Sequence, residues 1–292
     1  MDDTIITIYC LLDDFLKAMN RRDDAQVRLS TPEVMTIPLV AATFFGANLD
    51  KTRLFLHEEY GYMPNMISKS HLNRRLHAID PVLWRVLFEL LARIFKERNG
   101  PEFQTYAVDS LPVAVCDNIR IRRCRIYPLE EGYDADADAP NEERKSFRGY
   151  IASKRRYFYG LRVHSVVTGA GEPVEFSLAA GSEADIAIFK EMELDLPEGS
   201  IIIFADKAYT DYEYEGLLKE AGGLHLKAQR KKRSKRPMPL REEFLGKPIR
   251  QYIETVFSRP TSMFARKIHA VTARGFELKI VWLLLAFSIQ CL

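Results

Sequence analysis

Apolar residues recur at helical spacing through the first hundred positions of the chain. Between Ile5 and Met19 they lie three or four positions apart, which places them on one face of a helix. Thr31 and Pro32 form a typical helix start, with Thr31 as the N-cap and proline at the first helical position. Asn99-Gly100-Pro101 is a strong stop signal, and it marks the predicted domain boundary. We therefore expect an all-helical region over residues 1–100, with helices at 5–19, 34–45, 68–79 and 81–97.

The pattern changes after residue 101, where segments rich in Val, Ile, Phe and Tyr replace the helical spacing. Such segments are typical of strands, and the turn 169–173 between two of them indicates a hairpin. Three strands followed by alternating helices and strands predict a mixed α/β sheet, which we assign to a second domain over 101–292. The strands are expected at 105–116, 159–168, 174–178, 200–205 and 224–229, and the helices at 184–194, 211–221, 249–264 and 275–292.

The composition narrows the class of protein. Of the 292 residues, 47% are hydrophobic, which is too many for a disordered chain, and the length allows about two domains. The four cysteines are too scattered for a disulfide framework or a tetrahedral metal motif, so we expect a reducing compartment. The start Met1-Asp2-Asp3 is acidic where a signal peptide is basic, and the longest apolar run, Ile280–Phe287, is too short to cross a bilayer. We accordingly expect a cytoplasmic protein with no membrane partner.

Charge is segregated along the chain, although the formal net charge is only +2. Residues 129–143 contain seven acids and no base, which we interpret as a solvated acidic loop. Basic residues follow directly, and a second run places six cations among the seven residues 230–236, at the start of a basic loop that extends to 247. Each basic run is either a solvated loop or a surface for phosphates, because clustered cations release counterions from nucleic acid.

Three carboxylates occupy positions where chemistry can use them. Asp109 lies inside an apolar strand, where a lone charge is costly unless a cation or metal compensates it. Asp206 follows the apolar run 201–205, at the carboxyl end of a predicted strand, which is where ligands bind in open α/β sheets. Glu254 has apolar neighbours on a predicted amphipathic helix, so it can face the sheet. Taken singly, each acid has an ordinary structural explanation, such as an ion pair or a cap.

Taken together, three acids from a strand, a strand end and a helix make an oxygen-only site of the kind that binds Mg²⁺ or Mn²⁺. Two such ions roughly 3.5–4 Å apart activate the nucleophile and stabilise the leaving oxygen in phosphodiester chemistry. Asp117, Asp185 and Asp211 are alternative carboxylates. We expect Asp211 to cap its helix and Asp185 to lie in a first helical turn, where the dipole favours an acid. His164, in a strand, is expected to be a core residue rather than a ligand.

Short strings in the second domain carry a resemblance to a known family. Tyr159–His164, Gly171–Val174, Gly181–Asp185 and Ala205–Tyr209 together resemble the catalytic domain of bacterial insertion-sequence transposases of the DDE type. Val115–Arg120, Phe147–Tyr150, Ser153–Gly160 and Ile253–Ser258 are similar to the insertion-sequence subgroup numbered 982. The resemblance runs from about residue 68 to the C-terminus, and the combination is far more specific than any single string.

The resemblance implies an RNase H-like mixed sheet flanked by helices, with two Mg²⁺ ions in the active site and Mn²⁺ as a substitute. By motif match Asp109 is the first acid, Asp206 the second and Glu254 the third, so these are the expected catalytic residues and metal ligands. It also implies a bacterial, nucleoid-associated enzyme that binds double-stranded DNA at terminal inverted repeats, cleaves a strand and joins the freed 3′-OH to target DNA. Holding two element ends together requires at least a homodimer on DNA.

One departure from the family pattern concerns the third acid. Related transposases often carry Tyr-x2-Arg-x3-Glu-x6-Lys around it. Here Arg250 and Glu254 fit, whereas Lys247 and Thr261 stand at the Tyr and Lys positions. Arg266 or Lys267 is then the replacement cation, and the sequence does not decide between them.

We expect DNA contacts from both regions of the chain. Residues 68–76 have the polar and cationic character of the recognition helix in a helix-turn-helix, although many surface helices look similar. Lys207 directly follows the second acid and either contacts a phosphate or faces solvent. Tyr209, Tyr212 and Tyr214 either stack on bases or pack at a strand–helix junction. The expected DNA-binding residues are Lys69, Asn73, Arg74, Arg75, Arg148, Lys154, Arg155, Arg156, Lys207, Lys231, Lys232, Arg233, Arg250 and Lys267.

Three functions are compatible with these residues. A DNA transposase is the function we expect. The first alternative is a metal-dependent nuclease on the same fold without strand transfer, and the second is a non-catalytic DNA-binding protein derived from a transposase. Three intact acids argue against the last alternative, and a strand-transfer assay separates the first two.

Overall fold

The computed structural model describes residues 1–99, 105–116, 120–121, 124, 126–127, 147–151, 155–197, 199–230, 234, 236, 255 and 268–292. The chain divides into two compact units, which we call unit 1 (Met1–Leu90 with Ser262–Leu292) and unit 2 (Leu91–Thr261). Within the described residues no helix is long and apolar enough to cross a membrane. The predicted acidic loop at 129–143, most of the basic loop and the predicted helix 249–264, apart from Thr255, lie outside the described residues.

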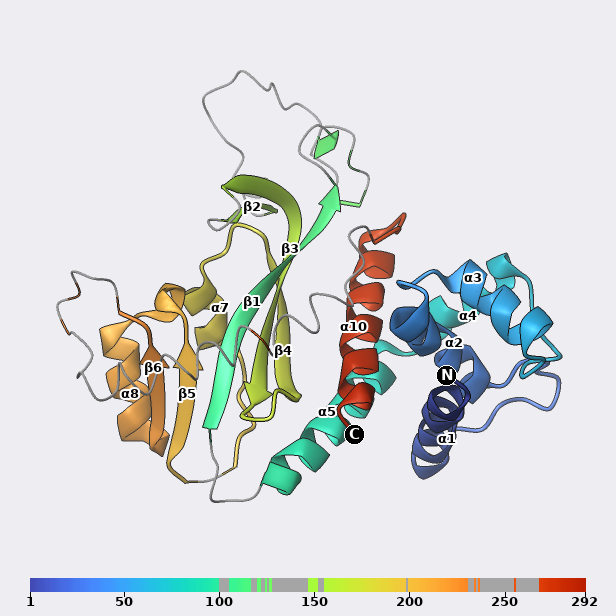
Figure 1. Ribbon diagram of the computed structural model, residues 1–292, viewed down its shortest axis with the longest axis horizontal. Helices are drawn as coiled ribbons and strands as arrows, with labels where there is room; N and C mark the ends of the chain where they lie inside the picture. The colour runs from blue at the N-terminus through green and yellow to red at the C-terminus, as the bar shows by residue number, and fades with distance from the viewer. Residues whose placement is uncertain are drawn as a thin grey trace. The chain divides into compact units, whose positions relative to one another are not determined.

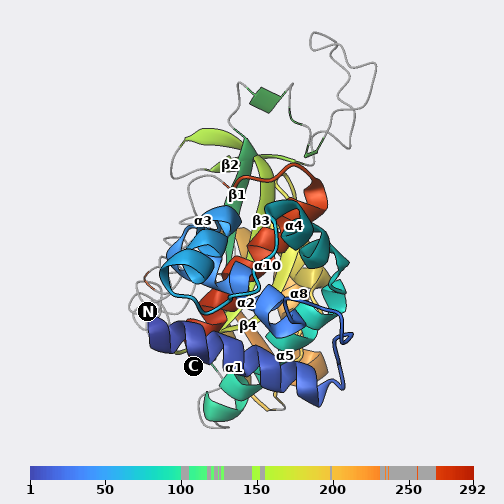
Figure 2. The same ribbon diagram turned by 90° about the vertical axis from the view of Figure 1, so that its right-hand side faces the viewer.

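Unit 1 is built of helices, as the sequence predicts (Figures 1 and 2). The predicted helices are confirmed to within a few residues, whereas a short helix and a π-helical turn after α2 were not predicted. The helices are α1 (Asp2–Ala18), α2 (Thr31–Phe44), α3 (Leu49–Leu54), the π-helix η1 (Phe55–Glu59), α4 (Lys69–Ala78), the first part of α5 (Pro81–Asn99) and α10 (Ala273–Gln290).

The start of α2 corrects the predicted cap by one residue. Ser30, not Thr31, is the N-cap, and its side chain accepts a hydrogen bond from the backbone N–H of Glu33. The Glu33 carboxylate in turn accepts from the Ser30 backbone N–H at 2.6 Å, which completes a capping box. The box requires an acid three positions after the cap, and Glu33 satisfies that spacing from Ser30 but not from Thr31.

The last helix packs in unit 1 rather than with the sheet. Most side chains of α10 are buried, and α10 lies against α2, which is also buried over most of its length. The Trp84 and Trp282 side chains meet edge to face, with ring centroids 6.0 Å apart. The predicted domain 101–292 places this helix with the mixed sheet instead. The difference has a physical reason, because two helices that are apolar on nearly all sides must bury each other.

Unit 2 is a six-stranded mixed sheet with helices packed against it (Figure 1). β3 pairs antiparallel with β1 on one side and with both β2 and β4 on the other, while β5 pairs parallel with β1 and β6 parallel with β5. The strand order is β4-β3-β1-β5-β6, in which β3 is antiparallel to its neighbours β4 and β1, and β1, β5 and β6 are parallel to one another. This arrangement is an RNase H-like sheet. The strands are β1 (Thr105–Cys116), β2 (Arg148–Ile151), β3 (Arg156–Thr168), β4 (Pro173–Ala180), β5 (Ile201–Ala205) and β6 (Leu224–Ala228).

The helices of unit 2 follow the predicted alternation with the strands. The helix α7 (Asp185–Glu191) packs against β3, and α8 (Tyr212–Gly222) packs against β6. A 3-10 turn, η4 (Lys207–Tyr209), connects β5 to α8. The five predicted strands and both predicted helices between 184 and 221 are confirmed, and β2 was not predicted because its four residues are too few to show an alternation.

Candidate active site

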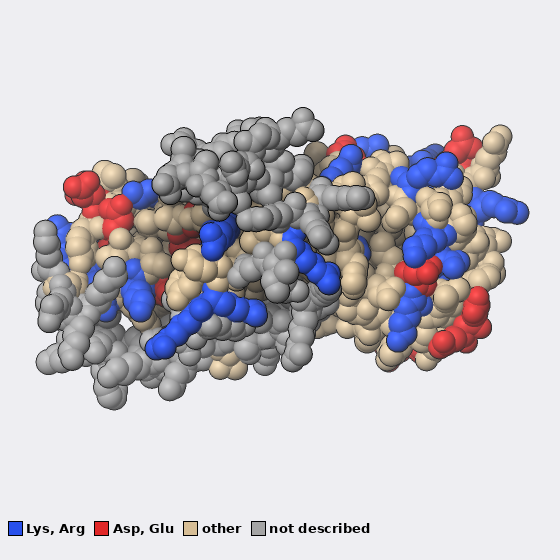
Figure 3. Space-filling model, turned by 90° about the horizontal axis from the view of Figure 1, so that it is seen from above, with Lys and Arg blue, Asp and Glu red and all other residues tan. Residues whose placement is uncertain are grey.

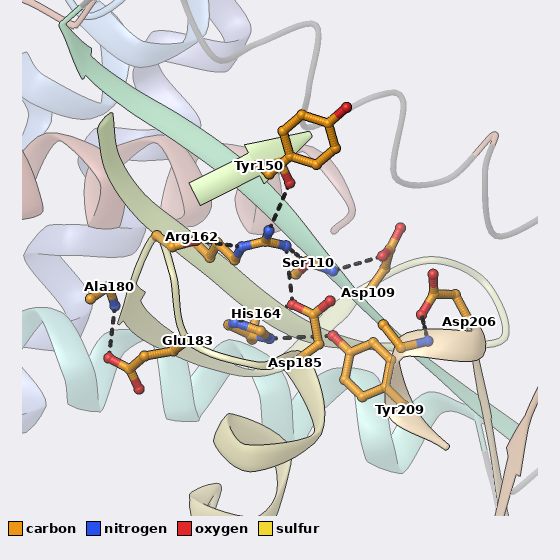
Figure 4. Close-up of polar contacts among 12 residues, drawn as sticks. Asp109, Ser110, Tyr150, Arg162, His164, Ala180, Glu183, Asp185, Asp206 and Tyr209 are labelled. Carbon is orange, nitrogen blue, oxygen red and sulfur yellow. Dashed lines mark hydrogen bonds and ion pairs between the residues drawn. The ribbon is translucent and has the colours of Figure 1, made fainter. Parts of the chain in front are cut away.

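The sheet brings the first two predicted acids side by side. The parallel pairing of β1 with β5 ends at Val108 opposite Ala205, and Asp109 and Asp206 directly follow these two residues in the chain. β5 stops there, while β1 continues alongside β3. In Figure 4 the two carboxylates lie near each other and point to the same side. The predicted juxtaposition of acids from a strand and a strand end is therefore present in the structure.

Local backbone contacts fix each of these carboxylates. One Asp109 oxygen accepts a hydrogen bond from the backbone N–H of Ser110 at 2.8 Å. Asp206 is the N-cap of η4, and its carboxylate accepts from the Ala208 backbone N–H at 2.6 Å. The Tyr209 backbone N–H closes the same turn on the Asp206 carbonyl at 3.3 Å. The position of the second acid thus depends on a short turn rather than on the strand alone.

A buried tyrosine lies within the electrostatic reach of both acids. Tyr209 is fully buried at the end of η4 and packs edge to face on Phe189 at 5.9 Å. Its pKa is raised well above the usual value, first by burial and then by the charges of Asp185, Asp109 and Asp206. Tyr209 therefore packs at the strand–helix junction, and its hydroxyl remains protonated beside the carboxylates.

A third acid, Asp185, belongs to this neighbourhood through an ion pair. It is the first residue of α7, as expected for an acid favoured by the helix dipole. Its carboxylate also accepts from Arg162 at 3.2 Å, an interaction that the sequence analysis did not anticipate. The same guanidinium donates to the Gly181 carbonyl at 3.0 Å, the Tyr150 carbonyl at 3.1 Å and the Ser110 hydroxyl at 3.3 Å (Figure 4).

His164 is completely buried in β3, which agrees with the expectation of a core residue. Its Nδ1 lies 3.3 Å from the Tyr209 hydroxyl, and its Nε2 lies 3.8 Å from Asp185 Oδ1. Burial, together with the positive charge of Arg162, lowers its pKa to about 4. The imidazole is therefore neutral near pH 7.

The third predicted acid, Glu254, and the alternative Asp117 lie outside the described residues. Among the residues that are described, no group of three His, Cys, Asp or Glu side chains is arranged to hold a metal ion. Asp211 is the N-cap of α8, as predicted, and its pKa is lowered by its hydrogen bond with Lys190. It is accounted for as a helix cap rather than as a catalytic group.

The predicted recognition helix is α4, and its four candidate DNA-binding residues differ in their surroundings. Leu72 and Leu76 face the core, while Lys69, Asn73 and Arg74 are exposed. Arg75 has a structural role instead. Its guanidinium donates to the Leu29 carbonyl and, at 3.2 Å, to the Thr31 hydroxyl, and it lies 3.6 Å from the Asp23 carboxylate.

The candidate DNA-binding cations of unit 2 that the structure describes are all exposed. Arg148 lies in β2 with its guanidinium 4.3 Å from the centre of the Tyr157 ring, and Arg155 and Arg156 lie at the start of β3. Lys207 is exposed in η4, directly after the second acid. Lys and Arg side chains are prominent on the face drawn in Figure 3. Lys154, Lys231, Lys232, Arg233, Arg250 and Lys267 lie outside the described residues.

Comparison with known proteins identifies the family. The family described as "Transposase DDE domain" matches residues 101–289, well over half of the chain. The chain belongs to this family. Transposases of the DDE family generally use divalent metal ions. The insertion-sequence subgroup stays a prediction.

Two solved transposase structures are similar to the chain at low sequence identity. The piggyBac transposase synaptic complex with hairpin DNA, determined by cryo-electron microscopy, is 12% identical, and the match covers 100% of this chain and 73% of that one with a TM-score of 0.46. The Mos1 transposase paired-end complex with the left transposon end is 11% identical, covering 89% of this chain and 80% of that one with a TM-score of 0.24. A search of curated proteins gave no match.

Proposed function

We propose that this DDE-family protein is the transposase of an insertion sequence, which binds the terminal inverted repeats and catalyses strand cleavage followed by transfer of the 3′-OH to target DNA. The observation that carries the proposal is the juxtaposition of Asp109 and Asp206 at the point where β5 ends beside β1. Two carboxylates at the carboxyl edge of an RNase H-like sheet are the core of a site for phosphodiester chemistry.

The carboxylate ligands of the site are suited to a divalent metal ion. Carboxylate oxygens are hard ligands of the kind preferred by Mg²⁺ and Mn²⁺, and adjacent strands supply two of them. Asp109 and Asp206 would hold the metal, with Glu254 as the third ligand from the segment beyond the described residues. When bound, two such ions supply an activated nucleophile and stabilisation of the leaving oxygen.

The protein's own part is to position the acids and the DNA. The backbone contact of Asp109 and the η4 turn of Asp206 help to hold the carboxylates in place. Lys207, exposed beside the second acid, would contact a phosphate near the scissile bond. Cations of α4 and of the β2–β3 hairpin supply further phosphate contacts, and two element ends held together imply a homodimer on DNA.

The decisive experiment measures cleavage of a labelled duplex that carries the source element's end, in Mg²⁺, in Mn²⁺ and with EDTA. We expect metal-dependent nicking at the element boundary by the wild type and none by Asp206→Asn. The substitution preserves the η4 cap, since asparagine caps as well as aspartate does. Asp211→Asn is the matched control, because it changes the cap of the next helix in the same way and should cleave normally.

Each outcome has a distinct meaning. Asp109→Asn and Glu254→Gln should also abolish cleavage while DNA binding persists, because a metal ligand is lost and the basic surface is not. Near-native cleavage by any of the three variants would show that this residue is wrongly assigned. Cleavage by the wild type without a joined product, when a 3′-OH oligonucleotide is supplied, would identify a nuclease instead of a transposase.

A further inference from the structure

Five buried or half-buried polar side chains connect four elements directly beneath the two acids. They are Ser110 on β1, Arg162 and His164 on β3, Asp185 at the start of α7 and Tyr209 at the end of η4, and we call them the buried network (Figure 4). Ser110 adjoins the first acid in sequence, and Tyr209 closes the turn that the second acid caps. Two members of the network are thus tied to the catalytic carboxylates by the backbone.

Hydrogen bonds join Arg162 to Ser110 and Asp185, and His164 to Tyr209. Arg162 Nη1 donates to the Ser110 hydroxyl at 3.3 Å and to Asp185 Oδ1 at 3.2 Å. The Tyr209 hydroxyl lies 3.3 Å from His164 Nδ1. His164 Nε2 lies 3.8 Å from Asp185 Oδ1, which is beyond hydrogen-bond distance, so the imidazole adjoins the ion pair without a hydrogen bond to it.

Donor and acceptor chemistry sets the position of the imidazole proton. A carboxylate only accepts and Asp185 lies on the Nε2 side, so the proton of the neutral imidazole belongs on Nε2. Nδ1 then accepts from the Tyr209 hydroxyl. The Asp185 charge thus orients the imidazole, and the imidazole orients the Tyr209 hydroxyl.

The ion pair also controls where the positive charge of Arg162 acts. The exposed fractions of the Arg162 and Asp185 side chains are only 17% and 13%, so water screens the pair weakly. Nη1 divides its hydrogen bonds between Asp185 and the residue next to Asp109. Without the Asp185 charge, an uncompensated cation would stand beside the first catalytic acid and oppose a divalent metal ion there.

We propose that Asp185 is a positioning residue that neutralises the Arg162 charge near the catalytic acids. The Tyr209 hydroxyl, through its contact with His164, helps to fix the turn that holds Asp206. This inference rests on the proposed function, because it assigns a role in metal binding to residues outside the catalytic triad. Arg162 accordingly joins neighbouring strands through its hydrogen bonds and does not contact DNA.

Charge balance provides the test. Asp185→Asn preserves size but leaves Arg162 unpaired, and Asp185→Asn combined with Arg162→Gln removes both charges. We expect the first to weaken Mn²⁺ binding by roughly tenfold or more, and the double variant to recover most of that loss. Mn²⁺ affinity is read by electron paramagnetic resonance on the full chain bound to the element-end duplex, alongside the Mn²⁺ concentration for half-maximal cleavage. Asp195→Asn, which removes a carboxylate 97% exposed on the same unit, is the control for net charge.

Tyr209→Phe tests the second half of the inference. The ring keeps its packing against Phe189 while the hydroxyl contact with His164 is lost, so we expect kcat for cleavage to fall with DNA affinity nearly unchanged.

Two results would overturn the inference while leaving the transposase proposal intact: Mn²⁺ binding by Asp185→Asn equal to that of the wild type, or a double variant that binds Mn²⁺ no better than Asp185→Asn. If the Asp109→Asn variant instead binds Mn²⁺ as tightly as the wild type, the proposed function is overturned, and this inference with it.

Discussion

Replacing Gly149 by alanine measures how tightly β2 is held against the rest of the catalytic sheet. A Cβ at this position would lie 2.1 Å from the Gly181 carbonyl oxygen and 2.3 Å from the Phe158 ring. Ordinary van der Waals contact begins at 3.4 Å, so β2 must move by about 1 Å. The Gly181 and Tyr150 carbonyls both accept from Arg162, so the movement also loosens two contacts of that guanidinium.

The expected cost follows from that overlap. Forcing a methyl group into a packed site typically costs about 1–3 kcal/mol, and the nearest atom here is backbone that cannot swing away. For a unit the size of Leu91–Thr261 this corresponds to a fall in Tm of roughly 2–12 °C. Because these Arg162 contacts are loosened, cleavage should fall as well.

Gly216→Ala is the matched control in the same unit. Nothing lies within 4 Å of a Cβ at Gly216, which is in the middle of α8. Alanine should therefore stabilise the unit by about 0.5–1 kcal/mol and leave cleavage unchanged. Scanning calorimetry gives both shifts, and tryptophan fluorescence serves as a reporter of unit 1, because Trp84 and Trp282 are the only tryptophans and both lie there. A Gly149→Ala protein as stable and active as the wild type would refute the close approach of β2 to Gly181.

Three further predictions concern charge. Arg75→Ala should destabilise unit 1 by about 1–3 kcal/mol, as followed by tryptophan fluorescence, because the buried Leu29 and the half-buried Thr31 lose the guanidinium that donates to them. Arg74→Ala should leave stability unchanged and reduce the salt slope of DNA binding by about 1. The pKa of His164 is lowered from 6.5 to about 4, so the unfolded chain binds a proton that the folded chain excludes. Stability should be fully present above pH 6.5 and fall by roughly 3 kcal/mol as the pH drops to 4, and His164→Gln should flatten this dependence in urea unfolding curves. Neutralising residues 231–233 should weaken DNA binding and flatten its salt dependence, and an unchanged slope would make that run a solvated loop.

The pattern of residues was sufficient for nearly all of the fold. Apolar periodicity placed the long helices and five of the six strands, because those segments each bury one face or both. It could not place β2, whose four residues alternate too briefly to give a signal. Nor could it assign α10 to a unit, since an all-apolar helix carries no information about which partner covers it.

The sequence was sufficient to predict the two acids of the site, but not the ion pair that lies beside them. Asp109 and Asp206 stood out because each interrupts or ends an apolar strand. Arg162 and Asp185 gave no such signal, since their pairing joins β3 to α7 through the fold. Arg75 shows the same limit on a helix. It resembles Arg74 in sequence, but its position beside the buried stripe of Leu72 and Leu76 turns it toward the core.

Stability alone does not explain why the mixed sheet contains a half-buried ion pair. Replacing a pair such as Arg162 and Asp185 by well-packed apolar residues is often neutral or stabilising, because two charges lose their hydration on burial. Apolar packing, however, fixes no hydrogen-bond direction, whereas this guanidinium joins β1, β2, the end of β4 and α7 at once. The proposed metal site takes one carboxylate from β1 and one from the turn after β5, and it would require that kind of constraint, since their spacing would decide whether a metal ion is held. Under this proposal the cation could serve there only with its charge cancelled locally, and Asp185 would supply the cancelling charge.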